Sequence, residues 1–135
     1  MATKVLDSHA LMALFNDESG AEEVEKLLVK AEGGSPKLLM SVINWGEIYY
    51  SVMRGVSPKM AEEKAKEIAG MQIEIVPVDA DLHLVRQAAI FKATKKMSYA
   101  DCFAAALAKL RNAELITGDP EFKAVEDQIK IDWIK

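Results

Sequence analysis

The amino-acid sequence predicts an α/β fold in which helices cover a mostly parallel sheet of about five strands. The main observation is alternation, because five short apolar runs are separated by longer segments with the apolar periodicity of helices. No internal repeat, low-complexity tract or linker rich in Gly, Pro or Ser divides the chain. We therefore expect residues 1–135 to form a single domain, which is long enough to bury a substantial hydrophobic core.

The predicted strands are the short apolar runs at residues 4–6, 37–40, 73–76, 114–117 and 129–134. Because helices connect successive strands, the strands should run parallel, and ligands should bind beyond their carboxyl ends. Asp7 and Asp119 come just after the first and fourth predicted strands. Both acids are therefore expected on the same side of the sheet.

The predicted helices occupy the segments between these strands. Three helix starts carry capping signals, namely the capping-box spacing of Ser19 and Glu22, the Ser57–Pro58 pair, and Asp79. The glycine pair Gly33–Gly34 would end the first of these helices. Two further segments, 41–53 and 98–109, are apolar on nearly every side and are therefore expected to form buried helices.

Composition narrows the class of protein. Hydrophobic residues make up 50% and charged residues 28% of the chain, as in an ordinary soluble globular protein. No apolar run reaches the length of a membrane span and the N-terminus lacks a signal-peptide pattern, so we expect a cytoplasmic protein with no membrane association. The single cysteine, Cys102, excludes an internal disulfide and a cysteine zinc site. The net charge of −4 argues weakly against a nucleic-acid partner, unless bound cations cancel several of the acids.

Most of the 21 acidic residues lie in dense charged stretches that are typical of solvated helix faces. Three acids instead stand alone in apolar surroundings: Asp7 between Lys4 and Asp17, Glu47 between Lys37 and Arg54, and Asp101 between Lys96 and Lys109. An unpaired buried carboxylate is strongly disfavoured, and these segments hold too few basic residues to pair with all three. A shared divalent cation would satisfy the three acids together.

Each candidate acid also has a structural interpretation. These interpretations are a capping box of Ser98 with Asp101, an N-cap of Asp119 before Pro120, an N-cap of Asp7 before the helix near His9, and an ion pair of Glu47 with Arg54. For each acid considered alone, the structural interpretation is favoured over a metal-binding role. Taken together, two acids after strands and two on apolar helices of one small domain favour a metal site. Oxygen ligands without cysteine or paired histidines indicate Mg²⁺ or Mn²⁺ rather than zinc.

Four segments carry these acids in order and span nearly the whole chain: VLDSHALMALF, SVINWGEIYYSV, SYADCFAAALA and LITGDPEF. Together they resemble the PIN-domain nucleases, and most of all the VapC-type toxins of bacterial and archaeal toxin–antitoxin pairs. Each motif is loose by itself, but four motifs in register at this chain length are specific. All four acids of the pattern are present.

The resemblance implies a three-layer α/β/α sandwich and a metal-dependent ribonuclease that hydrolyses RNA phosphodiester bonds. It implies that Mg²⁺ (or Mn²⁺) is held by Asp7, Glu47, Asp101 and Asp119. We expect the first three to bind the main metal, and Asp119 to hold a second metal or to orient water. The resemblance also implies a cognate antitoxin as partner and RNA products with 5′-phosphate and 3′-hydroxyl ends. Polar residues at matching positions are expected to assist, namely Ser8 and Thr117, with Ser41 and Asn44 supporting Glu47.

Further residues have two interpretations each. Four cations could meet the RNA backbone or simply form a solvated surface: Lys92, Lys95, Lys96 and Arg54. Four large apolar side chains on one helix could form a homodimer interface or antitoxin groove, or pack in the core: Trp45, Tyr49, Tyr50 and Met53. His9, His83 and Cys102 are expected to be structural.

Rival functions remain. A metal-dependent phosphatase of the aspartate-nucleophile type usually needs a second acid two positions after the first, where this chain has His9. A nucleotide-binding domain would need a glycine-rich phosphate loop, which the sequence lacks. A non-catalytic RNA-binding or assembly module on the same fold is the other alternative, and the intact acid set argues against it.

Overall fold

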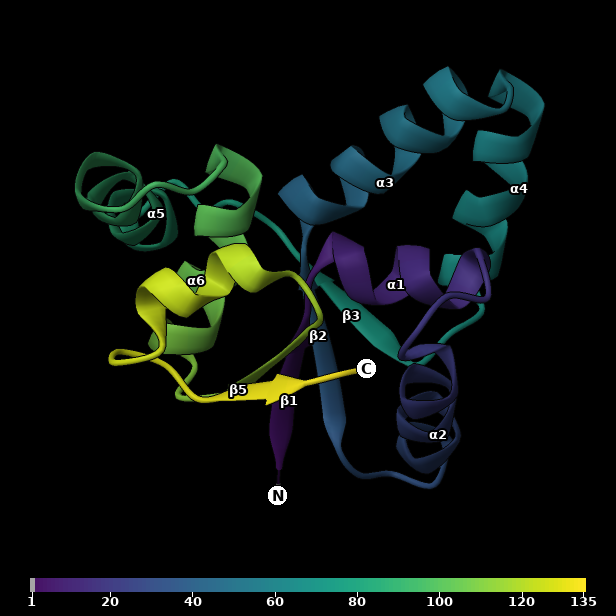
Figure 1. The fold of residues 1–135 in the computed structure, drawn as a ribbon, viewed down its shortest axis with the longest axis horizontal. Helices are drawn as coiled ribbons and strands as arrows, with labels where there is room; N and C mark the ends of the chain where they lie inside the picture. The colour runs from purple at the N-terminus through teal and green to yellow at the C-terminus, as the bar shows by residue number, and fades with distance from the viewer. Residues whose placement is uncertain (1) are drawn as a thin grey trace.

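Five parallel strands form one sheet in the computed structural model, which describes residues 2–135 (Figure 1). The strands are β1 (Thr3–Leu6), β2 (Lys37–Ser41), β3 (Ile73–Val76), β4 (Glu114–Thr117) and β5 (Ile131–Trp133). Their spatial order is β3-β2-β1-β4-β5, and all four pairings are parallel. The five predicted strands are confirmed, although β5 is shorter than the predicted run 129–134.

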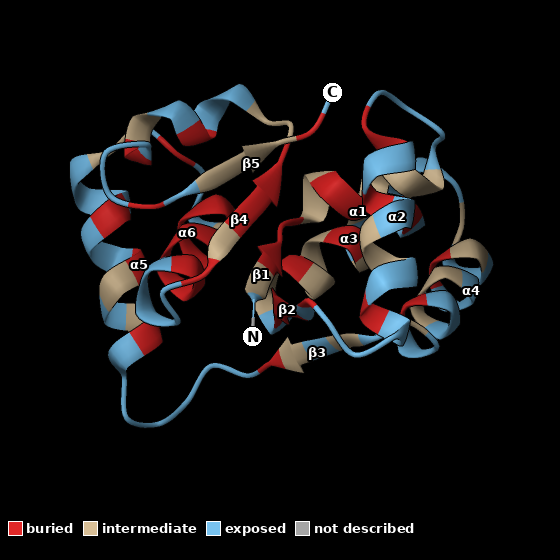
Figure 2. Cartoon of the chain, turned by 90° about the horizontal axis from the view of Figure 1, so that it is seen from below, coloured by how far each residue is buried: buried red, intermediate tan, exposed pale blue. Residues whose placement is uncertain are grey.

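Six α-helices and one 3-10 helix connect and follow the strands. They are α1 (Ser8–Phe15), α2 (Ala21–Glu32), α3 (Val42–Gly55), α4 (Pro58–Ala69), α5 (His83–Thr94), α6 (Tyr99–Leu110) and the 3-10 helix η1 (Pro120–Val125), all within residues 2–135. Figure 2 shows α1 to α4 on one side of the sheet and α5 and α6 on the other. The predicted three-layer α/β/α sandwich is therefore confirmed.

Side-chain alternation along the strands divides the core between these two faces. Val5 packs in the cluster formed with α5, α6 and η1, whereas its neighbour Leu6 packs in the cluster formed with α1 to α4. Leu115 and Ile116 of β4 divide in the same way. Successive side chains of a strand point to opposite faces, so a sheet covered on both sides needs continuous apolar runs such as these.

Helix α6 is buried over most of its length, as its apolar sequence predicts, and its residues from Asp101 to Ala108 are all buried. The prediction of a buried helix is only partly right for α3. One side of α3 packs on the core, but Tyr50 is 49% exposed and Met53 is 37% exposed. The reason is that α3 and α4 form a pair at the edge of the layer, so that only one side of α3 meets the core (Figure 1).

The local signals for helix ends are confirmed at some positions and wrong at others. The Ser57 hydroxyl accepts a hydrogen bond from the Met60 N–H, with Pro58 in the first turn, and α2 ends at Gly33 as predicted. The predicted Ser19 cap is wrong, because α2 starts after Gly20, which has a positive φ of 96°. A Cβ at Gly20 would lie 2.9 Å from Ile134, so the C-terminal segment packs closely against this junction.

The prediction that Asp79 caps the next helix is also wrong. Helix α5 starts later, at His83, after Leu82 in the left-handed conformation (φ 69°). The Asp81 carboxylate accepts a hydrogen bond from the His83 N–H at 3.1 Å, so a neighbouring acid takes the role expected of Asp79. Within residues 2–135, none of the helices combines the length and apolar character that a membrane-spanning helix requires.

Candidate functional site

The candidate site lies where the connections of the sheet change direction. From β1 the chain moves outward to β2 and β3, and it then returns to place β4 on the opposite side of β1. The carboxyl ends of β1 and β4 therefore lie side by side, with Asp7 directly after β1 and Asp119 two residues after β4. In open parallel sheets, ligands bind in the crevice at such a switch point.

Asp7 is fully buried at this junction and uses both carboxylate oxygens. Its Oδ1 accepts a hydrogen bond from the Ala10 N–H at 2.9 Å, so Asp7 does cap α1. Its Oδ2 accepts a hydrogen bond from the Thr117 hydroxyl at 2.6 Å. The capping interpretation and the site interpretation of Asp7 are therefore compatible.

Asp119 also has two roles. Its N–H donates to the Thr117 hydroxyl oxygen at 3.0 Å, and its Oδ1 accepts from the Glu121 N–H at 2.9 Å. Asp119 thus caps η1 through its Oδ1, and within residues 2–135 its second oxygen accepts no hydrogen bond. The resemblance to PIN-domain nucleases implied that Thr117 assists the acids. The Thr117 hydroxyl does connect Asp7 with the backbone of Asp119.

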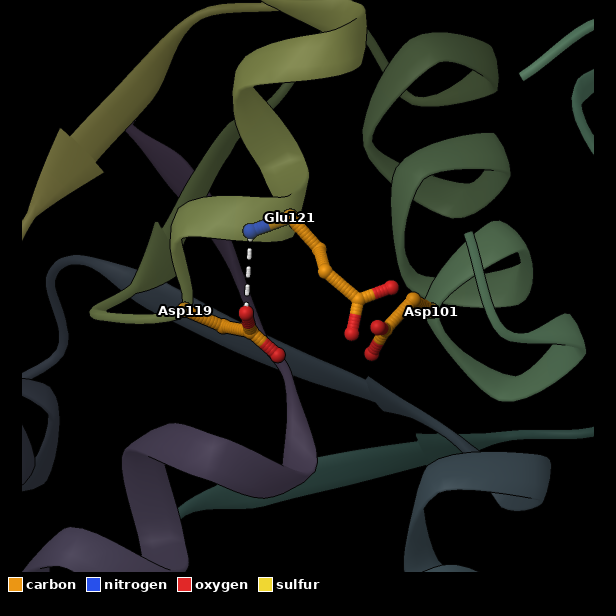
Figure 3. Close-up of side chains that lie close together, drawn as sticks. All are labelled: Asp101, Asp119 and Glu121. Atoms are coloured by element: carbon orange, nitrogen blue, oxygen red, sulfur yellow. Dashed lines mark hydrogen bonds between the residues drawn. The ribbon is translucent and has the colours of Figure 1, made fainter. Parts of the chain in front are cut away.

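Asp101 reaches the same place from α6, where it is 6% exposed. The Ser98 hydroxyl accepts a hydrogen bond from the Asp101 N–H at 3.2 Å, so the backbone half of the predicted capping box forms. The Ser98 side chain also hydrogen-bonds to the Asp101 carboxylate closely enough to lower the pKa of that acid. Figure 3 shows this carboxylate pointing toward Asp119 and Glu121, and ligand oxygens of the three acids lie within 4.8 Å of one another.

Glu121 is the site residue that sequence reasoning missed. In the sequence Glu121 does not stand alone in apolar surroundings, because Asp119 and Lys123 lie two positions away on either side. The available signal was its spacing from Asp119: the two acids flank Pro120 at the start of a helix, with Asp119 as the N-cap and Glu121 in the first turn. Of the described residues, only Asp101, Asp119 and Glu121 form a group of three or more potential ligands that satisfies this distance limit.

Glu47 lies beside this group rather than in it. Its carboxylate is half-buried and accepts a hydrogen bond from the Ser8 hydroxyl, so α3 and the start of α1 are joined here. Its negative charge is close enough to raise the pKa of Asp101. The alternative ion pair with Arg54 is not formed, because the Arg54 guanidinium lies over the Tyr50 ring at 5.3 Å.

The polar residues expected to support Glu47 have other partners. The Ser41 hydroxyl accepts a hydrogen bond from the Ile43 N–H at 3.2 Å and so caps α3. Asn44 donates from Nδ2 to the Ala100 carbonyl oxygen of α6 at 3.0 Å. Neither side chain hydrogen-bonds to Glu47 in the described chain.

Burial dominates the electrostatics of the site. Burial raises the pKa of Asp7 to about 7; the hydrogen bonds from Thr117 and Ala10 lower it, and the charges of Asp101 and Asp119 raise it. The pKa of Asp101 is likewise raised to about 7, first by burial and next by the charge of Asp119, whereas a hydrogen bond with the Ser98 side chain opposes the shift. None of these acids forms an ion pair with Lys or Arg within residues 2–135.

This donor set fits a divalent cation of the Mg²⁺ or Mn²⁺ kind. Such cations prefer several carboxylate oxygens, and they relieve the repulsion between crowded like charges. The chemistry of the ligands fits zinc less well, because neither cysteine nor paired histidines are present among them.

Other singled-out residues lie apart from the acids or pack against them. Cys102 is fully buried in the core. His83 is exposed at the start of α5, where it lines a cavity with Asp79 and Asp81. His9 packs against Gly118, since a Cβ at that glycine would lie 2.7 Å from His9 Cε1. Lys92 donates to the Met97 carbonyl oxygen at 2.9 Å, just before α6 begins.

Comparisons with known proteins agree with this architecture. The structure resembles VapBC2 from Rickettsia felis bound to a promoter DNA fragment, with a TM-score of 0.73 and 17% identity over 98% of this chain and 99% of that chain. It also resembles DNA-bound VapBC from Salmonella typhimurium, with a TM-score of 0.70 and 20% identity over 98% of both chains. A third similar structure is VapC20 of Mycobacterium tuberculosis, described as a Sarcin-Ricin loop cleaving toxin, with a TM-score of 0.70 and 19% identity over 90% of this chain and 94% of that chain.

At these identities the solved structures show a shared fold. No curated protein sequence gives a significant match to this chain. The family model for the PIN domain, however, matches residues 4–128, which is nearly the whole sequence. The chain therefore belongs to the PIN domain family.

Proposed function

We propose that this protein is a metal-dependent endoribonuclease, a hydrolase that cuts RNA phosphodiester bonds, and that it acts as the toxin of a toxin–antitoxin pair. The observation that carries the proposal is that ligand oxygens of Asp101 on α6 and of Asp119 and Glu121 at η1 lie within 4.8 Å of one another, near the buried carboxylate of Asp7. Burying carboxylates without basic partners opposes folding, so such a cluster is better explained by binding a cation than by stability. We also propose that residues 1–135 act as one PIN domain.

The proposed metal ligands are Asp7, Glu47, Asp101 and Asp119, with Glu121 added on the basis of its distance from Asp101 and Asp119. When bound, Mg²⁺ or Mn²⁺ stabilises negative charge on the scissile phosphate and activates water for in-line attack. We assign the main metal to Asp7, Glu47 and Asp101. Asp119 and Glu121 would hold a second ion or orient the attacking water.

The polypeptide's part in this chemistry is to hold the acids in place. Thr117 and the Ala10 N–H fix both oxygens of Asp7, and Ser8 fixes one oxygen of Glu47. Helices α1, α3 and α6 all begin at this edge of the sheet, and the positive ends of their dipoles favour carboxylates and phosphate there. A buried Asp7 cannot rotate freely, so its orientation toward a ligand is fixed before the ligand arrives.

RNA is the proposed substrate and an antitoxin the proposed partner. Structurally similar chains include a Sarcin-Ricin loop cleaving toxin and toxins solved in complexes with antitoxins, which supports both assignments. We propose that Lys92, Lys95 and Lys96, which precede the start of α6, meet the RNA backbone. The exposed apolar side chains of α3 support a homodimer or an antitoxin contact. We also propose that the protein acts in the cytoplasm.

A cleavage assay on purified protein tests the proposal. Structured and unstructured RNA would be incubated with Mg²⁺, with Mn²⁺ and with excess chelator, using wild type, Asp101→Asn, Glu121→Gln and the control Glu63→Gln on the exposed face of α4. We expect cleavage only with metal, its loss in Asp101→Asn, a reduced rate in Glu121→Gln and wild-type cleavage in Glu63→Gln. RNA that is bound but left intact with every metal would support the binding-module alternative, and full activity in chelator would overturn the metal mechanism.

Expression in cells tests the toxin assignment separately. Induction of the wild-type chain should slow growth and produce new RNA 5′ ends, whereas Asp101→Asn at the same soluble level should do neither. Normal growth with intact RNA at high soluble wild-type expression would contradict the toxin role.

A further inference from the structure

Asn44 is a fully buried polar residue that connects two of the helices carrying the acids. It lies in the first turn of α3, and its Nδ2 donates to the Ala100 carbonyl oxygen in the first turn of α6 at 3.0 Å. The two residues are 56 positions apart in the sequence. Helices α3 and α6 pack against each other, so this hydrogen bond lies in their interface.

The direction of this hydrogen bond is fixed by the chemistry of its partner. A carbonyl oxygen only accepts, so the amide nitrogen of Asn44 must face Ala100. The Oδ1 atom of Asn44 is then buried, and it finds no donor among residues 2–135. A buried acceptor without a partner destabilises the folded protein. Asn44 is thus a poor choice for stability alone, because leucine has a similar size and no orphan atom.

The residues next to this hydrogen bond are two of the proposed ligands. Glu47 lies three positions after Asn44, on the same side of α3, because residues three apart in a helix are neighbours. Asp101 directly follows Ala100. The hydrogen bond therefore joins the first turns of α3 and α6 next to both of these proposed ligands.

We propose that Asn44 is a positioning residue, which aligns Glu47 on α3 with Asp101 on α6 for the binding of one divalent cation. This inference rests on the proposed function. It assigns to Asn44 an effect on metal affinity and catalytic rate that is separate from any effect on folding. Partners in the outer shell of a metal site typically change affinity or activity by about 10-fold to 100-fold.

The test compares Asn44→Leu with the control Ile43→Val. Leucine preserves approximate size and removes both the donor and the orphan acceptor, whereas Ile43→Val removes one methyl group from the neighbouring residue, which packs against the α6 cluster. Thermal unfolding without metal, calorimetric titration with Mn²⁺ and steady-state cleavage of RNA would be measured for each variant.

For Asn44→Leu we expect a metal-free melting temperature equal to or above that of wild type. We expect the Kd for Mn²⁺ to rise by about 10-fold or more, and kcat to fall with KM for RNA unchanged. Ile43→Val should keep the wild-type Kd and kcat. A folded Asn44→Leu protein with wild-type Kd and kcat would overturn the inference. If leucine prevents folding, Asn44→Ala, which cannot clash, would be measured against the same expectations.

Hydrogen exchange in the metal-free protein separates this inference from the proposed function. Loss of the Asn44 hydrogen bond should speed amide exchange at residues 101–104 of α6 in Asn44→Leu but not in Ile43→Val. If wild type neither binds Mn²⁺ nor cuts RNA, the proposed function fails, and faster exchange would still support the alignment of α3 with α6. Unchanged exchange at these amides would overturn the alignment itself.

Discussion

Thr117, at the end of β4, donates a 2.6 Å hydrogen bond to Oδ2 of Asp7, at the end of β1. The same hydroxyl oxygen accepts a hydrogen bond from the Asp119 N–H at 3.0 Å. A threonine hydroxyl has one proton to donate, and here it is committed to Asp7. The two neighbouring strands are thereby linked through the acids that follow them.

This relationship predicts that Thr117→Val impairs the site without changing its shape. Valine matches the size of threonine but cannot donate, so the buried Asp7 carboxylate loses a partner that lowers its pKa. We expect metal affinity to fall by about 10-fold to 100-fold. Calorimetric titration with Mn²⁺ checks this, with Thr94→Val as control because the exposed Thr94 hydroxyl donates to the Ile90 carbonyl oxygen of its own helix. Equal Kd values for wild type and Thr117→Val would contradict the prediction.

The stability of the metal-free protein should fall as pH rises. The pKa values of Asp7 and Asp101 are raised, mainly by burial, from 3.8 to about 7. Between these values the folded protein retains protons that the unfolded chain has released, so the free energy of unfolding decreases with pH across this window. Urea unfolding in chelator, from about pH 4 to about pH 8, measures this slope.

Asp7→Asn should flatten that slope, because asparagine does not titrate, whereas Glu63→Gln on the exposed face of α4 should leave it unchanged. Adding Mg²⁺ should restore stability most strongly above about pH 7, where the acids are ionised and can bind the cation. A metal-free stability that rises with pH through the same window would show that other groups dominate.

The mutants Asp101→Ala and Asp119→Ala should differ in metal-free stability. Burial and the charges of Asp119, Glu47 and Glu121 raise the pKa of Asp101 more than the Ser98 side chain lowers it, so removal of this carboxylate mainly relieves repulsion and should leave the melting temperature unchanged or higher. The Asp119 carboxylate caps η1 through the Glu121 N–H, so its removal should cost roughly 0.5–2 kcal/mol.

Thermal unfolding of both mutants, with chelator and with Mn²⁺, distinguishes these effects. Both mutants should gain less stability from Mn²⁺ than wild type does, because each has lost a proposed ligand. Equal, metal-independent destabilisation of the two proteins would return both acids to structural roles.

Gly118→Ala should destabilise the junction between β4 and η1 through crowding. The added Cβ would lie 2.7 Å from His9 Cε1 and 3.2 Å from the Ile134 carbonyl oxygen. Such overpacking typically costs about 1–3 kcal/mol. Replacing His9 with alanine removes the closer contact but not the carbonyl contact. The double mutant His9→Ala/Gly118→Ala should therefore recover part of the loss, and a double-mutant cycle from urea unfolding measures the coupling.

Simple additivity of the two substitutions would show that His9 and Gly118 do not constrain each other. The effect of these substitutions on metal binding is separate from their effect on stability. Because Gly118 precedes Asp119, we expect Gly118→Ala to weaken Mn²⁺ binding more than His9→Ala does.

The sequence by itself determined the alternation of strands and helices, the parallel sheet and the burial of α6. These follow from local properties, because the period of apolar residues along a segment decides which faces can be buried. The isolation of Asp7 and Asp101 in apolar segments could also be identified from the sequence alone. Both side chains are buried in the structure, as that isolation predicted.

Only the tertiary structure decided which partners these side chains meet. The insertion of β4 beside β1 brings Thr117 to Asp7 across 110 positions, and the packing of α3 on α6 brings Asn44 to Ala100 across 56 positions. The same strand order carries Glu121 into reach of Asp101. Local capping rules could not foresee these outcomes, because they describe a residue's near neighbours and strand order is set by the whole core. For the same reason the capping signal at Ser19 did not predict the start of α2, where Gly20 has a positive φ and packs against Ile134 from the far end of the chain.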